Sequence, residues 1–142
     1  MATDLQKILS ISGEHGLFRY LSQGRNGIIA ESLETGRRTV FGMSSKVTAL
    51  SDISIYTDGG EISLKDVFVK MKEMLSEEDA PSPKSGEKAI TGFFAQAVPD
   101  YDRNRFYVSH MKKVLGWYSL LKRYASLDFT EEEKEKEEDG KE

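Results

Sequence analysis

Asp100, Asp102 and Asn104 have the spacing that opens a calcium-binding loop of the EF-hand type. That loop also needs glycine at its sixth position, for a sharp turn, and glutamate at its twelfth, for charge. Arg105 and Met111 occupy those two positions, so the pattern lacks what the ion requires. We instead expect one of the two aspartates to form a side-chain-bonded turn or to pair with a neighbouring arginine.

Nucleophilic catalysis would need a serine and a base that face each other. Ser109 and His110 are adjacent, which points their side chains apart on a helix. The other histidine, His15, has no second ligand at a metal-binding spacing. The sequence has no cysteine, no Gly-x-Ser-x-Gly elbow and no phosphate-binding glycine loop. We therefore predict a protein that is not an enzyme, with no metal site, cofactor or disulfide.

The segment 89–130 differs from the rest of the chain in its side chains. It contains nine of the fourteen Phe, Tyr and Trp residues, and six Lys or Arg against three Asp, a net charge of +3. The segment 131–142 carries eight acidic and three basic side chains, a net charge of −5. Because Trp, Tyr and Arg are common at the centres of protein interfaces, this composition is typical of a binding surface.

Two candidate surfaces follow from the placement of the cations. For a protein partner or self-association, the expected surface comprises Arg103, Arg105, Lys112, Lys113, Trp117 and Tyr124. The alternative is binding of RNA or single-stranded DNA through the small N-terminal barrel and the basic, aromatic helical segment, with Arg19, Arg25, Arg37, Arg38 and Lys46 as the barrel's contacts. A pI of 5.3 is far from that of a typical nucleic-acid binder, and the acidic tail would compete with phosphate.

Residues 17–57 predict β structure, because short apolar stretches alternate with turn signals. Asn26-Gly27 is a strong hairpin signal within this region. About five short strands are expected, at residues 17–21, 28–33, 37–41, 47–50 and 53–56. Strands this short, joined by tight turns, predict a small antiparallel barrel of the Src-homology or Sm type. Residues 4–9 are expected to form a short helix or an edge strand.

Helical spacing of apolar residues predicts a helix over residues 63–75. Ser63 is its expected N-cap, and Asp66 completes a pattern that resembles a capping box. A second helix is expected over residues 89–98, where Pro99 ends it.

A third helix is expected to begin at Ser109, as its cap, and to end near Ser126. One of its apolar stripes would face a core: Met111, Val114, Leu115, Tyr118, Leu121 and Ala125. A second stripe lies about 100° around the helix: Trp117, Leu120 and Tyr124. Since a segment of about 40 residues rarely buries a core alone, we expect the two helices to pack on the β part, dimerise or hold a partner.

The sequence predicts an α+β protein in several parts. These are a barrel-like domain with a packing helix at 1–76, a linker at 77–88, a helical segment at 89–130 and a disordered acidic tail at 131–142. No apolar run approaches the ~20 residues that cross a bilayer, so no membrane association is expected. The absence of cysteine and of a signal peptide fits a cytoplasmic location.

The sequence as a whole resembles a family of small bacterial proteins of unknown function. The N-terminal half carries this resemblance at Ile11-Ser12-Gly13, Gly16-Leu17, Ser22-Gln23, Arg25-Asn26-Gly27, Glu31-Ser32-Leu33, Gly36-Arg37 and Ile53-Ser54-Ile55-Tyr56. The C-terminal half carries it at Pro99-Asp100-Tyr101-Asp102, Arg105, Val108-Ser109, Lys113 and Trp117-Tyr118. The resemblance covers nearly the whole chain apart from the acidic tail. It implies a small β domain followed by a helical segment in a bacterial cytoplasm, and it implies no active site.

Overall fold

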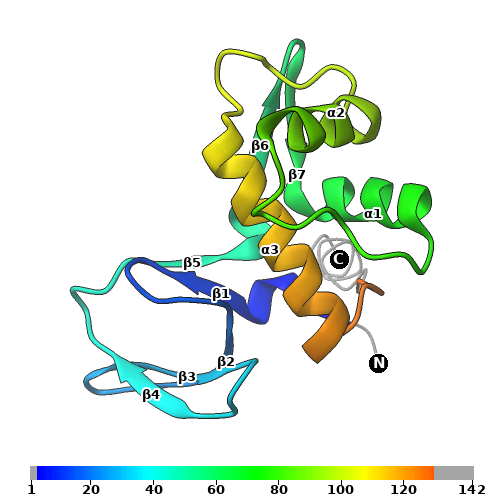
Figure 1. Ribbon diagram of the computed structural model, residues 1–142. Helices are drawn as coiled ribbons and strands as arrows, with labels where there is room; N and C mark the ends of the chain where they lie inside the picture. The colour runs from blue at the N-terminus through cyan, green and yellow to red at the C-terminus, as the bar shows by residue number, and fades with distance from the viewer. Residues whose placement is uncertain (1–2, 130–142) are drawn as a thin grey trace, which may run out of the picture.

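The computed structural model describes residues 3–129, which form the α+β fold expected from the sequence. A five-stranded antiparallel sheet lies at one end of the molecule (Figure 1). Three α-helices and a separate two-stranded hairpin lie at the other end. No helix among these residues is both long and apolar enough to cross a membrane.

The sheet has the strand order β4-β3-β2-β1-β5. Its strands are β1 (Ile8–Ile11), β2 (Phe18–Gly24), β3 (Gly27–Ser32), β4 (Arg38–Phe41) and β5 (Val47–Ala49). β1 lies between β2 and β5, with Leu9 opposite both Phe18 and Ala49. The sheet is curved (Figure 1). Within residues 3–129, no strand pairing joins β4 to β5, so the sheet is not a closed barrel.

The hairpin predicted at Asn26-Gly27 is confirmed. Gly24 pairs with Gly27 across a turn formed by Arg25 and Asn26. Gly27 has φ +143°, and a Cβ atom at this position would collide with the carbonyl group of Phe41 on β4. Glycine is therefore required here both by the backbone conformation and by the close approach of the neighbouring strand.

The strand predicted at residues 53–56 exists but does not belong to the sheet. It is β6 (Ser54–Thr57), which pairs with β7 (Gly60–Ser63), a strand that sequence analysis missed. A one-turn 3-10 helix, η2 (Leu50–Asp52), separates β5 from β6. The sheet instead takes β1 as its fifth strand, after the 3-10 helix η1 (Leu5–Lys7). Apolar alternation predicts a strand but does not specify its pairing partner, which explains the error.

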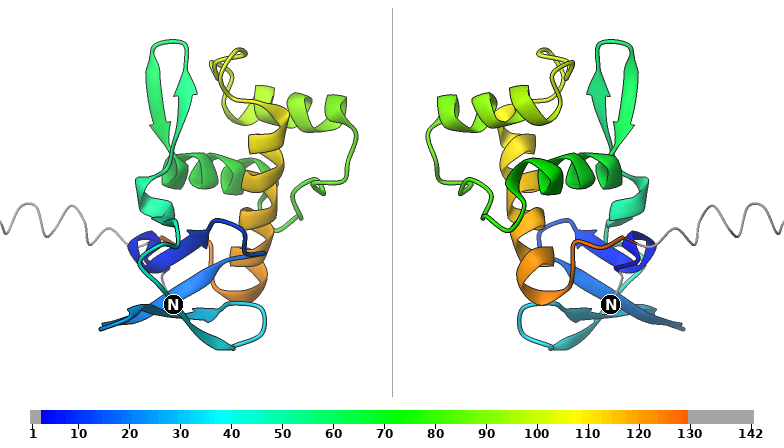
Figure 2. Two further views of the ribbon diagram at one scale, coloured as in Figure 1. Left: turned by 90° about the vertical axis from the view of Figure 1, so that its left-hand side faces the viewer. Right: turned by 90° about the vertical axis from the view of Figure 1, so that its right-hand side faces the viewer.

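The helices are α1 (Leu64–Leu75), α2 (Glu87–Ala97) and α3 (Val108–Tyr124). The Ser63 cap is confirmed, because its Oγ accepts a hydrogen bond from the Asp66 backbone N–H at 3.1 Å. The predicted Ser109 cap is wrong: Tyr107 occupies the N-cap position, and Ser109 lies in the first turn of the helix. α3 passes α1 and α2 and ends beside the sheet (Figure 2).

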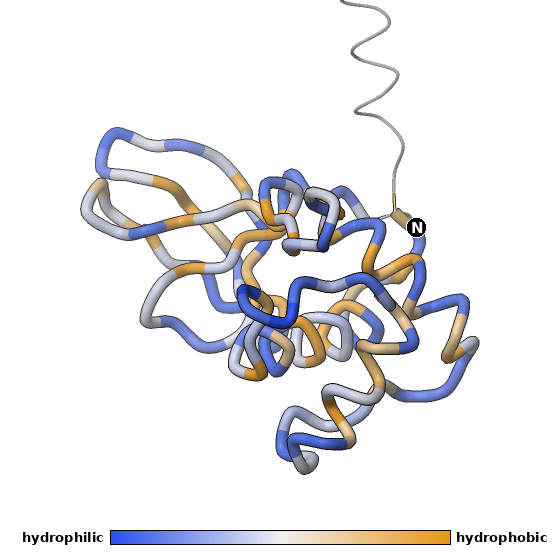
Figure 3. Tube along the Cα trace, turned by 90° about the horizontal axis from the view of Figure 1, so that it is seen from above, coloured by the Kyte–Doolittle hydropathy of each residue, from blue (hydrophilic) through white to orange (hydrophobic). Residues whose placement is uncertain are grey.

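Two apolar clusters lie on opposite sides of β1. Its alternating side chains send Leu9 and Ile11 into a cluster within the curved sheet and Ile8 into a larger cluster under the helices. The sheet cluster consists of Leu9, Ile11, Phe18, Ala30 and Phe41. The helical core includes Leu64, Val67, Phe68, Met71, Ile90, Phe94, Met111, Val114, Leu115, Tyr118 and Leu121. Hydrophilic residues predominate in the outer loops (Figure 3).

The two ends of the described chain meet. The Thr3 backbone N–H donates to the Asp128 carbonyl at 2.6 Å, and the Thr3 hydroxyl donates to the Ser126 carbonyl at 2.8 Å. Phe129 stacks on Phe68 of α1 with ring centroids 5.8 Å apart. The segment after α3 is thus fixed both to the start of the chain and to the helical core.

Residues 76–86 connect α1 to α2 without helix or strand. α1 shares one core with α2 and α3 across this connection. The division of the chain into a domain 1–76, a linker 77–88 and a helical segment 89–130 stays a prediction. The disorder predicted for 131–142 lies outside the residues that the structure describes.

Candidate functional site

The loop before α3 contains the turn that the sequence predicted at Asp102. Its Oδ1 accepts a hydrogen bond from the Asn104 backbone N–H at 2.8 Å, and its Oδ2 accepts one from Arg105 Nε at 3.0 Å. The bond from the Asn104 backbone, together with the Arg105 guanidinium, holds the pKa of Asp102 below its ordinary range. Within residues 3–129, no three potential metal ligands gather at one place.

The same loop is attached to β6. The Asp102 backbone N–H donates to the Tyr56 carbonyl at 2.9 Å, and the Arg105 guanidinium lies over the Tyr56 ring, 4.6 Å from its centroid. These contacts hold Arg105 and Tyr56 together at one edge of a hollow. Arg103 points elsewhere: it stacks on the Tyr101 ring at 3.8 Å and donates to the Tyr101 carbonyl at 2.6 Å.

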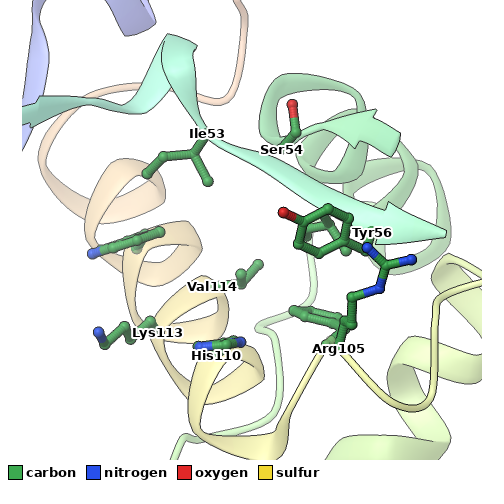
Figure 4. A pocket seen from close by; sticks show the side chains of 10 residues that line it. Ile53, Ser54, Tyr56, Arg105, His110, Lys113 and Val114 are labelled. Carbon is green, nitrogen blue, oxygen red and sulfur yellow. The ribbon is translucent and has the colours of Figure 1, made fainter. Parts of the chain in front are cut away.

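The hollow lies between β6 and α3 and has a volume of about 260 Å³ (Figure 4). Its floor is apolar, because Ile55, Phe106 and Val114 are almost fully buried. Its rim is formed by exposed or half-buried side chains: Ile53, Ser54, Tyr56, Arg105, His110, Lys113 and Trp117. No carboxylate lines it.

Two further hollows continue along the same helix. The second, of about 470 Å³, lies between α3 and residues 10–16 and shares Lys113 and Trp117 with the first. The third, of about 280 Å³, shares Leu120 with the second and reaches Tyr124. We call the three together the α3 groove, whose helical side is formed by His110, Lys113, Trp117, Leu120 and Tyr124.

Two lysines of the groove carry a positive charge that no ion pair neutralises within residues 3–129. Lys112 and Lys113 are exposed, and neither forms an ion pair or a side-chain hydrogen bond with any residue in 3–129. The carboxylates that line the groove are Glu14 in the second hollow and Glu34 in the third. Glu34 has His15 as a neighbour, with Oε1 3.6 Å from Nε2.

The structure brings most of the first predicted surface together. Arg105, Lys113 and Trp117 line the first hollow, and Lys112 lines the second beside them. Tyr124 lies at the far end of the groove. Arg103 lines none of the three hollows, because its guanidinium is bound to its own loop.

The alternative, nucleic-acid set is distributed over strands and loops of the sheet. Arg19 and Arg38 flank Glu31 on one face of the sheet, with nitrogen–oxygen distances of 3.8 and 3.4 Å. Arg25 and Arg37 lie in the turns at opposite ends of β3. The remaining member, Lys46, precedes β5. The first two cations therefore share a carboxylate.

Sequence analysis missed the parts of the groove that face α3. Tyr56 fell within a predicted strand, and residues 10–16, about 100 positions from the helix they face, belonged to no predicted helix or strand. No local pattern connects them with residues 105–124. The one signal in the sequence was the second apolar stripe of α3, whose members Trp117, Leu120 and Tyr124 all line the groove.

Two family models match the chain, and each describes a domain of unknown function. DUF5606 matches residues 5–50, and DUF6852 matches residues 53–121. A solution NMR structure from Bacteroides vulgatus, a structural genomics target, is 33% identical, with a TM-score of 0.69. The match covers 86% of this chain and 87% of that chain. The chain belongs to the same family as this Bacteroides vulgatus protein. No curated protein matches it.

These matches confirm the resemblance to a family of unknown function. The boundary between the two matched segments falls at η2. The first model covers η1 and the five strands of the sheet; the second begins just before β6 and ends within α3. The first hollow of the groove lies wholly within the second matched segment. The second hollow is lined by both segments, since residues 10–16 belong to the first. Neither model indicates a catalytic family.

Proposed function

We propose that this protein is a non-enzymatic interaction module that binds a partner protein along the α3 groove. The observation that carries the proposal is the pair Lys113 and Trp117, which the first two hollows share. An ammonium group without an acidic partner lies there beside a half-buried indole. Interface hot spots combine such aromatic side chains with charge in partly enclosed positions.

The groove combines apolar and positively charged side chains, which favours a protein partner over one bound by charge alone. The floor of the first hollow is apolar and offers contact area, whereas Arg105 and Lys113 lie on its rim and Lys112 lies in the adjoining second hollow. Apolar contact supplies affinity, and complementary charge at the rim supplies orientation and association rate. We also propose a bacterial cytoplasmic location, which the cysteine-free composition supports.

The test is capture from a nuclease-treated bacterial lysate with the full-length chain as bait. The variant Arg105→Glu/Lys113→Glu reverses two charges of the groove. The control Lys70→Glu/Lys88→Glu makes the same change in net charge at exposed positions on α1 and α2. We expect one protein to be retained in stoichiometric amount by the wild type and the control and to be lost with the groove variant. Equal retention by the groove variant would contradict the proposal.

Binding of RNA or single-stranded DNA is the second candidate. It is supported by Tyr56 and Trp117, whose rings lie beside cations and are able to stack on bases. Contacts to phosphate weaken steeply as salt rises, whereas apolar protein contacts do not. Nucleic acid retained by the wild type, released by moderate salt and lost with Arg105→Glu/Lys113→Glu would favour this candidate over the first.

A further inference from the structure

The first hollow separates apolar from charged contacts. Ile55, Phe106 and Val114 on its floor are 4%, 4% and 3% exposed. Lys113 stands on the rim toward the second hollow, where Lys112 continues the positive charge. An occupant that satisfies both features needs an apolar body and a negative charge on one side of it.

The volume limits the size of that apolar body. At about 260 Å³ the hollow is smaller than the ~300 Å³ at the lower end of ordinary ligand pockets, but it is large enough for one aromatic side chain. Trp117 and Tyr56 supply aromatic walls, and ring pairs favour offset or edge-to-face packing within such a space.

The cations on the rim have different roles. Arg105 Nε is bound to Asp102, and its guanidinium lies on the Tyr56 ring, so Arg105 is held as part of the wall. Lys113 has no acidic partner among residues 3–129, and the first hollow has no carboxylate. A carboxylate brought to this rim is therefore left to pair with Lys113, and with Lys112 beyond it.

We propose that the α3 groove binds a peptide segment of its partner in which one aromatic residue is flanked by Asp or Glu. The aromatic side chain fills the first hollow, and the neighbouring carboxylates lie against Lys113 and Lys112. This inference rests on the proposed function, since it names the chemistry of the partner at the same site.

Trp117 allows the proposal to be tested directly. It is the only tryptophan in the chain and lines both hollows, so its emission and its indole N–H resonance report on occupancy. Three acetylated and amidated pentapeptides serve as probes for the full-length protein: Glu-Glu-Phe-Glu-Glu, Gln-Gln-Phe-Gln-Gln and Glu-Glu-Ala-Glu-Glu. Phenylacetate tests whether a free small acid is sufficient.

We expect the Glu-Glu-Phe-Glu-Glu peptide to shift the Trp117 signal saturably. The glutamine peptide should bind at least about fivefold more weakly, because it lacks the charge, and the alanine peptide at least about tenfold more weakly, because it leaves the hollow unfilled. Lys113→Gln should reduce the difference in affinity between the first two peptides, because only Lys112 then remains to pair with the carboxylates. The control Lys70→Gln, on α1, should leave the order unchanged.

Three results would overturn the proposal. Equal binding of the alanine and phenylalanine peptides would mean that the hollow is not used. Phenylacetate bound as tightly as the charged peptide would identify a site for free small acids. No change in the emission or indole N–H resonance of Trp117 with any probe would exclude binding of such a segment in the first hollow.

These failures are distinguishable from failure of the proposed function. Capture of a protein that depends on Arg105 and Lys113, without the expected order of peptides, would remove only the inference about the segment. Peptide affinities in the expected order, without capture of any protein, would instead support the binding chemistry of the groove and contradict the proposed role as an interaction module.

Discussion

On the outer face of the sheet, Arg19 and Arg38 lie on either side of Glu31, whereas in the α3 groove Lys112 and Lys113 have no acidic partner among residues 3–129. The two regions have similar numbers of cations in the sequence. They differ in whether a carboxylate forms an ion pair with these cations. Local pairing, and not the local count of Lys and Arg, therefore determines which cations are left without a counter-charge.

The same two regions differ in how much apolar surface they bury. The sheet cluster has five buried residues, and its aromatic pair, Phe18 and Phe41, remains 7% and 8% exposed. The helical core takes residues from all three helices and from η1, β1 and η2 as well. The helical side therefore carries most of the buried contacts, and it also presents the groove.

The largest expected effect is a loss of stability on replacing a phenylalanine of the helical core, compared with one of the sheet cluster. Phe68→Ala should lower the free energy of unfolding by about 3–5 kcal/mol, because Phe68 is fully buried between Tyr118 and Phe129. Phe41→Ala should cost less, because Phe41 lies on an edge strand and makes one ring contact, with Phe18. Urea denaturation of both variants measures the difference. Equal losses would show that the two clusters contribute alike.

The next effect concerns a polar group inside the larger core. Tyr118 is fully buried, and its hydroxyl has no hydrogen-bond partner within residues 3–129. Burial raises the pKa of Tyr118, so the hydroxyl stays protonated at neutral pH. Tyr118→Phe should leave stability unchanged or raise it by up to about 1 kcal/mol, since an unsatisfied buried group is removed. A loss of more than about 1 kcal/mol in thermal or urea unfolding would reveal a partner that the hydroxyl uses.

A single substitution should make the sheet resemble the groove. Glu31→Gln removes the carboxylate that Arg19 and Arg38 share. Stability should change by less than about 1 kcal/mol, because these pairs are largely exposed. Affinity for single-stranded DNA at low salt should rise roughly two- to fivefold, measured by fluorescence anisotropy. The matched change Glu61→Gln, in the separate hairpin, should not produce this gain. Unchanged affinity in Glu31→Gln would mean that pairing with Glu31 does not limit the binding of DNA by Arg19 and Arg38.

The smallest effect is a pH dependence at the edge of the groove. The folded-state pKa of Asp102 is lowered, chiefly by the Asn104 backbone hydrogen bond, so its contribution is complete above about pH 4 and is lost as pH falls through the lowered pKa. Asp102→Asn cannot titrate, so the stability difference from wild type should be constant above pH 4 and shrink toward pH 2. Urea unfolding of both proteins across this pH range measures the difference. A difference that grew on acidification would contradict a lowered pKa of Asp102 in the folded state.

Much of the local structure could be predicted because it depends on neighbours in sequence. The turn at Asn26-Gly27, the Ser63 cap and the buried stripe of α3 each follow from residues a few positions apart. The second stripe, which includes Trp117, packs against the core only in part and also lines the groove. These features are set by backbone conformation and by periodicity, which the sequence displays directly.

The rest depends on contacts between distant segments. The pairing of Leu9 with Ala49 joins the first strand to the last of the sheet, and apolar alternation in neither strand identifies the other. The groove needs Tyr56 from β6 and residues 10–16 opposite α3. The pairing of Arg19 with Glu31 likewise depends on the register of β2 against β3. Charge and periodicity along the chain contain none of this information.

The junction between Thr3 and Asp128 has a consequence for how the chain is connected. Because its backbone hydrogen bond joins the two ends of the described chain, the fold is nearly a closed ring. A short linker between these ends, with new termini within residues 76–86, would reorder the elements without cutting a strand or a helix. Tension applied at the two ends would reach this junction first, and the sheet and the helical core would bear load only after it had opened.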